Sequence, residues 1–220
     1  MSKDAFWALI QEAKTACGQD LNAMEDYLRE QLVSMGPAAA KNFHDILQTY
    51  EDLADQYGLW DAVSVIKEYG CSDDGFIDFR AWLIAQGKEV YMNALRDPDT
   101  LADIEPYGDC CFECLSYVGD YAYEQLTGRS AYDEMEPDRI EKLRDELKKD
   151  IVYKDGIQYP REPKDLPRFL PRLCEKYGGP ERFQVTPSTW NFDLHEIRRL
   201  LDEGKVQDMA TKKEKGGGAR

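Results

Sequence analysis

Apolar residues recur every three or four positions through most of this 220-residue chain. Near its start, Phe6, Ile10 and Ala13 share one face of a helix that Gly18 can end. Comparable stripes follow with short breaks, many of them at glycine or proline. The pattern predicts helices over 6–17, 24–35, 43–57, 60–67, 76–83, 90–96, 111–122, 137–147, 170–177 and 194–201, with a short helical turn near 97–101.

One segment has a different pattern. Val152 and Ile157 lie on either side of Asp155-Gly156, a pair of residues typical of two-residue hairpin turns. We therefore expect a mainly α fold of about eight to ten packed amphipathic helices, with one small β-hairpin near Asp155-Gly156.

Composition divides the chain into three parts. Residues 1–130 are expected to form a helical unit, and residues 131–203 a helical extension packed on it. Residues 204–220 have no apolar period, contain Gly216-Gly217-Gly218, and carry five basic and two acidic side chains, a net charge of +3. We expect them to form a flexible basic tail.

The charge balance excludes two classes of partner. The chain has 28 Lys and Arg against 43 Asp and Glu, a formal net charge of −15. Binding to nucleic acid or to anionic lipid needs a surplus of cations, so we expect neither partner.

The N-terminus lacks the features of a signal peptide, and no apolar run is long enough to cross a bilayer. We expect a cytoplasmic protein whose six cysteines stay reduced.

The segment 71–83, CSDDGFIDFRAWL, has the densest polar chemistry. Its spacing partly matches a calcium-binding EF-hand loop, but the carboxylates required at the first and last loop positions are missing. The favoured interpretation is a helix start, in which Ser72, Asp73 or Asp74 caps the helix that follows. The alternative is a polar functional surface formed by Asp73, Asp74, Asp78, Arg80 and Trp82.

The remaining candidate groups are weaker. Cys111 and Cys114 form a single C-x-x-C, too few ligands for a structural zinc site, and we expect small buried thiols. His44 and His195 lie in helical segments outside any catalytic motif. We expect no resident metal and no cofactor.

A second candidate surface is acidic. Five carboxylates fall within thirteen residues that contain no cation, and Tyr107, Phe112 and Tyr117 lie in or just after this stretch. Such a stretch is typical of a solvated loop, but it also suits a recognition patch for a basic protein partner. The carboxylates of this acidic segment are Asp97, Asp99, Asp103, Glu105 and Asp109.

With these residues in view, the chain resembles a bacterial family called domain of unknown function 4240. The resemblance is strongest over 60–103, around G-C-S-D-D-G-F and F-R-A-W-L-I. The opening F-W-A-L-I and residues 112–128 are also similar, so that the likeness spans about residues 4–130 and, more loosely, 165–178. It implies a bacterial cytoplasmic helical protein and carries no activity or site residues.

Three functional hypotheses follow. We favour a non-catalytic acidic module that binds a basic protein partner. The alternative is a divalent-metal-dependent hydrolase or transferase that uses Asp73, Asp74 and Asp78. A redox or zinc protein built on Cys111 and Cys114 is the third. The sequence does not indicate an oligomeric state.

Overall fold

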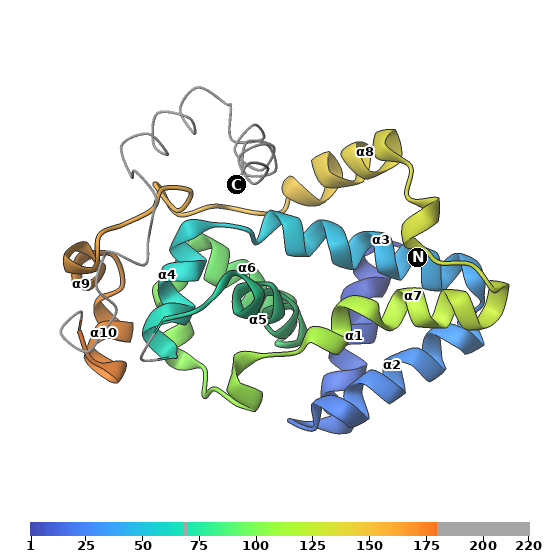
Figure 1. Cartoon of the computed structure of the whole chain (residues 1–220), viewed down its shortest axis with the longest axis horizontal. Coiled ribbons are helices and arrows are strands. Elements are labelled where there is room, and N and C mark those ends of the chain that lie inside the picture. The colour runs from blue at the N-terminus through green and yellow to red at the C-terminus, as the bar shows by residue number, and fades with distance from the viewer. Residues whose placement is uncertain (68–69, 180–220) are drawn as a thin grey trace, which may run out of the picture.

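The computed structural model describes residues 1–67 and 70–179, and these residues are mainly helical (Figure 1). The predicted helical fold is confirmed. The helices, with 3₁₀ turns labelled η, are α1 (Lys3–Cys17), α2 (Leu21–Met35), α3 (Pro37–Leu53), α4 (Tyr57–Ile66), α5 (Asp73–Ala85), α6 (Lys88–Arg96), η1 (Pro98–Asp103), η2 (Gly108–Cys110), α7 (Glu113–Thr127), η3 (Tyr132–Glu134), α8 (Pro137–Lys148), η4 (Pro163–Asp165), α9 (Leu166–Phe169) and α10 (Pro171–Tyr177).

The core is built around α3. Tyr50 on this helix lies between Phe6 and Trp7 of α1 and Tyr91 of α6, with ring centroids 4.8–5.6 Å apart. The Trp7 Nε1–H donates to the Tyr50 hydroxyl at 3.0 Å, and the Tyr91 hydroxyl donates to the Tyr50 carbonyl at 2.6 Å. Buried aromatic rings with satisfied polar atoms fix these helices against one another.

Two expected helix starts are confirmed. The Ser72 hydroxyl accepts the Gly75 N–H at 3.1 Å and caps α5, which places Asp73 and Asp74 in its first turn. The Asp97 carboxylate accepts the Asp99 N–H at 3.2 Å, and Pro98 occupies the first position of η1. Both arrangements satisfy backbone N–H groups that a helix start leaves unpaired.

The expected β-hairpin is wrong, because the described residues contain no strand. Asp155-Gly156 does form a turn, in which Gly156 has a φ of +72°. The Ile157 N–H closes the turn on the Lys154 carbonyl at 3.1 Å, but the return bond of a hairpin is absent between these two described residues. The Ile157 carbonyl instead accepts the Gly58 N–H at 2.7 Å, and the Lys154 N–H donates to the Leu95 carbonyl at 3.0 Å. Because these backbone groups already have partners on α4 and α6, they are not available to pair two strands.

The chain after α7 packs back on the earlier helices. In Figure 1, α8 lies beside α3, while α9 and α10 lie beyond α4, at the end away from α2 and α7. Arg139 of α8 donates to Asn42 of α3 at 2.5 Å, and the Tyr153 hydroxyl donates to the Leu53 carbonyl at 2.9 Å. The domain boundaries stay a prediction, and the helix expected over 194–201 and the tail 204–220 lie outside the described residues.

None of the helices in the described part of the chain combines the length and the apolar character that spanning a bilayer requires.

Candidate functional site

Helices α3 and α7 cross at Gly119, where their backbones nearly touch. A Cβ atom at Gly119 would lie 2.8 Å from the backbone nitrogen of His44. The missing side chain therefore permits this close approach. It brings polar side chains of both helices together in the interior. We call this group the polar seam; it consists of His44, Gln48, Glu51, Ser116, Asp120 and Tyr132.

Hydrogen bonds join the two sides of the polar seam. The Ser116 hydroxyl donates to the Glu51 carboxylate at 2.5 Å. The Ser116 carbonyl accepts the Gln48 amide at 3.1 Å and the Tyr132 hydroxyl at 3.4 Å. One serine of α7 thus connects α3 with η3.

Asp120 positions the segment that carries Tyr132. Its buried carboxylate accepts the Ser130 hydroxyl at 2.9 Å and the Ala131 N–H at 2.6 Å. The segment after α7 therefore turns back over the α3–α7 crossing, and the ring of Tyr132 meets His44 edge-on with centroids 4.3 Å apart.

Glu51 has an unusual electrostatic environment. Burial raises its pKa to about 7; the Ser116 hydrogen bond and the positive charge of Arg80 act in the opposite direction. A carboxylate far from water favours its neutral form unless donors or cations compensate. Glu51 therefore changes charge close to neutral pH.

His44 is completely buried. Burial lowers its pKa to about 4, so the imidazole is neutral at neutral pH. Within the described residues neither ring nitrogen has a hydrogen-bond partner. His44 therefore occupies the seam as a packing group against the ring of Tyr132.

Among the residues expected to form a polar surface, Arg80 reaches this region. Its guanidinium donates to the Glu51 carbonyl at 3.3 Å, lies 3.4 Å from the Asp55 carboxylate, and stacks 5.1 Å from the ring centre of Phe76. Arg80 thus joins α5 to the end of α3.

The other four residues of that expected surface lie in different environments and do not form one surface. Asp78 is half-buried and accepts the Cys111 thiol at 3.1 Å, whereas Asp73 and Asp74 are exposed at the start of α5. Trp82 is buried between Phe79 and Tyr107, so it belongs to the core. No group of three or more His, Cys, Asp or Glu in the described residues is placed to hold a metal ion.

The cysteines are free thiols. Cys114 is exposed and Cys111 half-buried, so the expectation of two buried thiols is wrong for Cys114. Burial is the largest of the effects that raise the pKa of both thiols, and nearby carboxylates add to it. A raised pKa keeps a thiol protonated and slow to react, which does not support redox chemistry at this pair.

The acidic segment is largely paired with the chain's own C-terminal part. Asp97 lies 2.7 Å from Lys154, Glu105 lies 2.8 Å from Lys176, and Asp103 pairs with Arg172. Asp99 is buried and accepts the backbone N–H groups of Arg172 and Leu173 at 3.1 and 2.9 Å, at the start of α10. Less negative charge is therefore open to a separate partner than the sequence indicates.

A tyrosine surface adjoins the polar seam and shares the partly exposed Tyr132 with it. Tyr117 and Tyr121 of α7 stack with ring centroids 5.9 Å apart. Tyr121 is 45% exposed and Tyr132 is 39% exposed, high values for large rings. Glu113 and Glu124 lie one turn from Tyr117 and Tyr121, and neither is in a salt bridge within the described residues. We define the tyrosine surface as Tyr117, Tyr121, Tyr132, Glu113 and Glu124.

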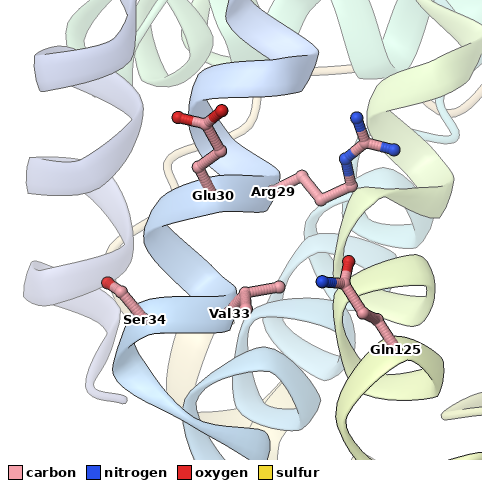
Figure 2. Close-up of a pocket in the computed structure, with 5 residues that line it drawn as sticks. All are labelled: Arg29, Glu30, Val33, Ser34 and Gln125. Atoms are coloured by element: carbon pink, nitrogen blue, oxygen red, sulfur yellow. The ribbon is translucent and has the colours of Figure 1, made fainter.

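A groove lies between α7 and α2. Figure 2 shows Gln125 of α7 facing Val33 and Arg29 of α2, with Glu30 and Ser34 further around α2. The groove has a volume of about 460 Å³. Gln125 follows Tyr121 by one helical turn, so the groove continues the exposed face of α7.

Sequence reasoning missed the polar seam, and of the three rings of the tyrosine surface it named only the half-buried Tyr117. The available signal was the helical spacing of His44, Gln48 and Glu51, three polar residues at positions i, i+4 and i+7 of α3. Their partners on α7 lie about seventy positions away, and local spacing does not reveal them.

The chain was compared with known families, curated proteins and solved structures. A family model described as "Protein of unknown function (DUF4240)" matches residues 1–125. No curated protein matches the chain. No solved structure matches it either.

Proposed function

Because the chain belongs to the DUF4240 family, whose function is unknown, we propose its function from its own surface: a non-catalytic module that binds a basic segment of a protein partner at the tyrosine surface. The proposal includes a bacterial cytoplasmic setting, as the composition and the family resemblance suggest. The observation that carries it is the exposed Tyr121 stacked on the half-buried Tyr117, flanked by Glu113 and Glu124, which have no salt-bridge partner within the described residues.

The chemistry of this surface suits a cation. A tyrosine ring attracts a guanidinium or ammonium group placed over its face. Tyrosine and arginine are also over-represented at the centres of protein interfaces, and a tyrosine loses little side-chain freedom on binding. Glu113 and Glu124 add negative charge at the two ends of the stacked pair. An arginine-rich segment would find both kinds of contact along one helix.

The tyrosine surface is favoured over the acidic segment for one reason. Asp97, Asp103 and Glu105 already have cationic partners within the chain. A separate basic protein would have to displace those contacts, whereas Glu113 and Glu124 have no salt-bridge partner within the described residues.

The test is isothermal calorimetry of the whole chain with a capped hexa-arginine peptide. Nonspecific attraction to a protein of net charge −15 would weaken with salt but would not depend on particular rings. We therefore compare Tyr121→Ala, which removes the ring, with Tyr121→Phe, which keeps it. Val152→Ala, at another exposed apolar position, is the matched control.

We expect Tyr121→Ala to weaken binding roughly tenfold, while Tyr121→Phe and Val152→Ala stay close to the natural chain. Equal binding by all four proteins would show a nonspecific attraction and contradict the proposal. Absence of binding to the natural chain at low salt would contradict it as well.

A further inference from the structure

The carboxylate of Glu51 is buried beneath the tyrosine surface without an ion-pair partner among the described residues. Within the part of the chain that the structure describes, its hydrogen-bond donor is the Ser116 hydroxyl at 2.5 Å. Arg80, the nearest cation, directs its guanidinium to the Glu51 carbonyl and to Asp55. A charge on Glu51 is therefore only partly compensated where it lies.

Charged and titratable groups face Glu51 from every side. The negative charges of Asp52 on α3 and Asp78 on α5 disfavour the ionised form of Glu51. The positive charge of Arg80 on α5 favours it. Ser116 and Tyr117 face it from α7, and Tyr132 from η3. Tyr91 of α6 also lies within reach of its charge. The tyrosines stay neutral near neutral pH, because their pKa values are raised above 10.

Glu51 is also close to the surface that we propose binds cations. Ser116, which holds its carboxylate, precedes Tyr117 in α7, and the Tyr132 hydroxyl donates to the Ser116 carbonyl. The negative charge of Glu51 contributes to raising the pKa of both tyrosines, so it acts at their hydroxyl groups.

We propose that Glu51 is a proton-binding site that couples pH to recognition: a cationic segment seated on the tyrosine surface drives the release of one proton from the Glu51 carboxyl. This inference rests on the proposed function and assigns its regulation. The reaction is a simple ionisation, in which the carboxyl O–H bond breaks, the electron pair stays on oxygen and the proton passes to solvent.

The direction follows from linkage. In the free chain burial raises the pKa of Glu51 to about 7. A nearby cation favours the ionised carboxylate and lowers that pKa, and by reciprocity the ionised carboxylate binds the cation more tightly. Affinity should therefore rise between pH 6 and pH 8, roughly fivefold for one charge acting through a partly aqueous medium.

The experiment is calorimetry of the full chain with the capped hexa-arginine peptide at pH 6, 7 and 8, in two buffers of different ionisation enthalpy. The difference in heat between buffers counts the protons released on binding. Glu51→Gln keeps the shape but cannot ionise. Glu12→Gln, at an exposed position on α1, is the matched loss of one carboxylate. Asp61, whose pKa burial also raises to about 7, is unchanged in all three proteins.

We expect the natural chain and Glu12→Gln to release a fraction of a proton near pH 7 and to bind roughly fivefold more tightly at pH 8 than at pH 6. Glu51→Gln should bind with little pH dependence. Peptide binding with the same pH dependence in Glu51→Gln would overturn the coupling and leave the proposed function standing. No binding by any protein would overturn both.

Discussion

Ser116 and Glu51 join α7 to α3 through a hydrogen bond of 2.5 Å between a buried hydroxyl and a buried carboxylate. The bond lies next to the Gly119 crossing and below Tyr132, so it links the interior packing to the tyrosine surface. Because Glu51 has no ion pair among the described residues, this donor is, together with the charge of the nearby Arg80, what stabilises its ionised form.

Removing the Ser116 hydroxyl should destabilise the chain in a pH-dependent way. The hydrogen bond lowers the pKa of Glu51, so Ser116→Ala raises it further above about 7. A carboxyl whose pKa is raised by folding contributes stability below its unfolded pKa, and that contribution is lost as the pH rises through the folded pKa. We expect a loss of about 1–3 kcal/mol in the free energy of unfolding at pH 8 and a smaller loss at pH 5.

Urea unfolding at the two pH values checks this prediction. Ser34→Ala is the control, because among the described residues the Ser34 hydroxyl bonds within its own helix, to the Gln31 carbonyl. A loss for Ser116→Ala that is equal at both pH values, or larger at pH 5, would count against the account of Glu51.

Gly119→Ala should separate α3 from α7. The added methyl group would lie 2.8–2.9 Å from the His44 backbone and Cβ, which cannot move aside as a flexible side chain could. Overpacking of this kind costs about 1–3 kcal/mol, more than the gain from helix propensity. Thermal unfolding should show a lower midpoint than in Glu124→Ala, an exposed position on the same helix. An unchanged or higher midpoint would show that the helices can move apart freely.

Asp99 should be the most important carboxylate of the acidic segment for stability. It accepts two backbone N–H groups at the start of α10, whereas Asp103 is exposed and pairs with one arginine. We expect Asp99→Ala to lower the free energy of unfolding by about 2 kcal/mol. Asp103→Ala should change it far less, because its ion pair is exposed to solvent. Chemical unfolding of both variants measures the difference, and equal effects would contradict it.

The thiols should react in the order of their exposure. Cys114 is exposed, Cys17, Cys71 and Cys111 are half-buried, and Cys110 and Cys174 are buried. Burial also raises the pKa of Cys71 and Cys110 to about 11. With a disulfide reagent at pH 8, Cys114 should react first and Cys110 only after unfolding. Mass spectrometry of the labelled peptides identifies the order, and early labelling of Cys110 would contradict the packing around η2.

The sequence predicted what depends on neighbouring residues. Helical stripes, the Ser72 cap and the Asp97-Pro98 start are local patterns, and the structure contains them. The Asp155-Gly156 turn also formed, but the hairpin did not, because the flanking backbone bonds to the ends of α4 and α6. The backbone groups to which a segment hydrogen-bonds depend on the tertiary structure and not on its own sequence alone.

The candidate site depended on distant contacts and was harder to predict. Arg80 was identified, and it reaches the polar seam. Its expected companion Trp82 is a core residue, because α5 is surrounded by other helices and buries most of its faces. The sequence shows the run of five carboxylates in the acidic segment, but not which cations they contact. Its pairing with Lys154, Arg172 and Lys176 joins residues 57 to 71 positions apart, beyond the range of local spacing.

The most direct test of the central claim is to locate the bound cationic peptide on the chain. Hydrogen–deuterium exchange of the natural chain, with and without the capped hexa-arginine peptide, reports which backbone segments become protected. The account predicts added protection over 113–134, where the tyrosine surface lies, and none over 97–109. Protection confined to 97–109, with α7 unchanged, would place the partner on the acidic segment and contradict the proposal.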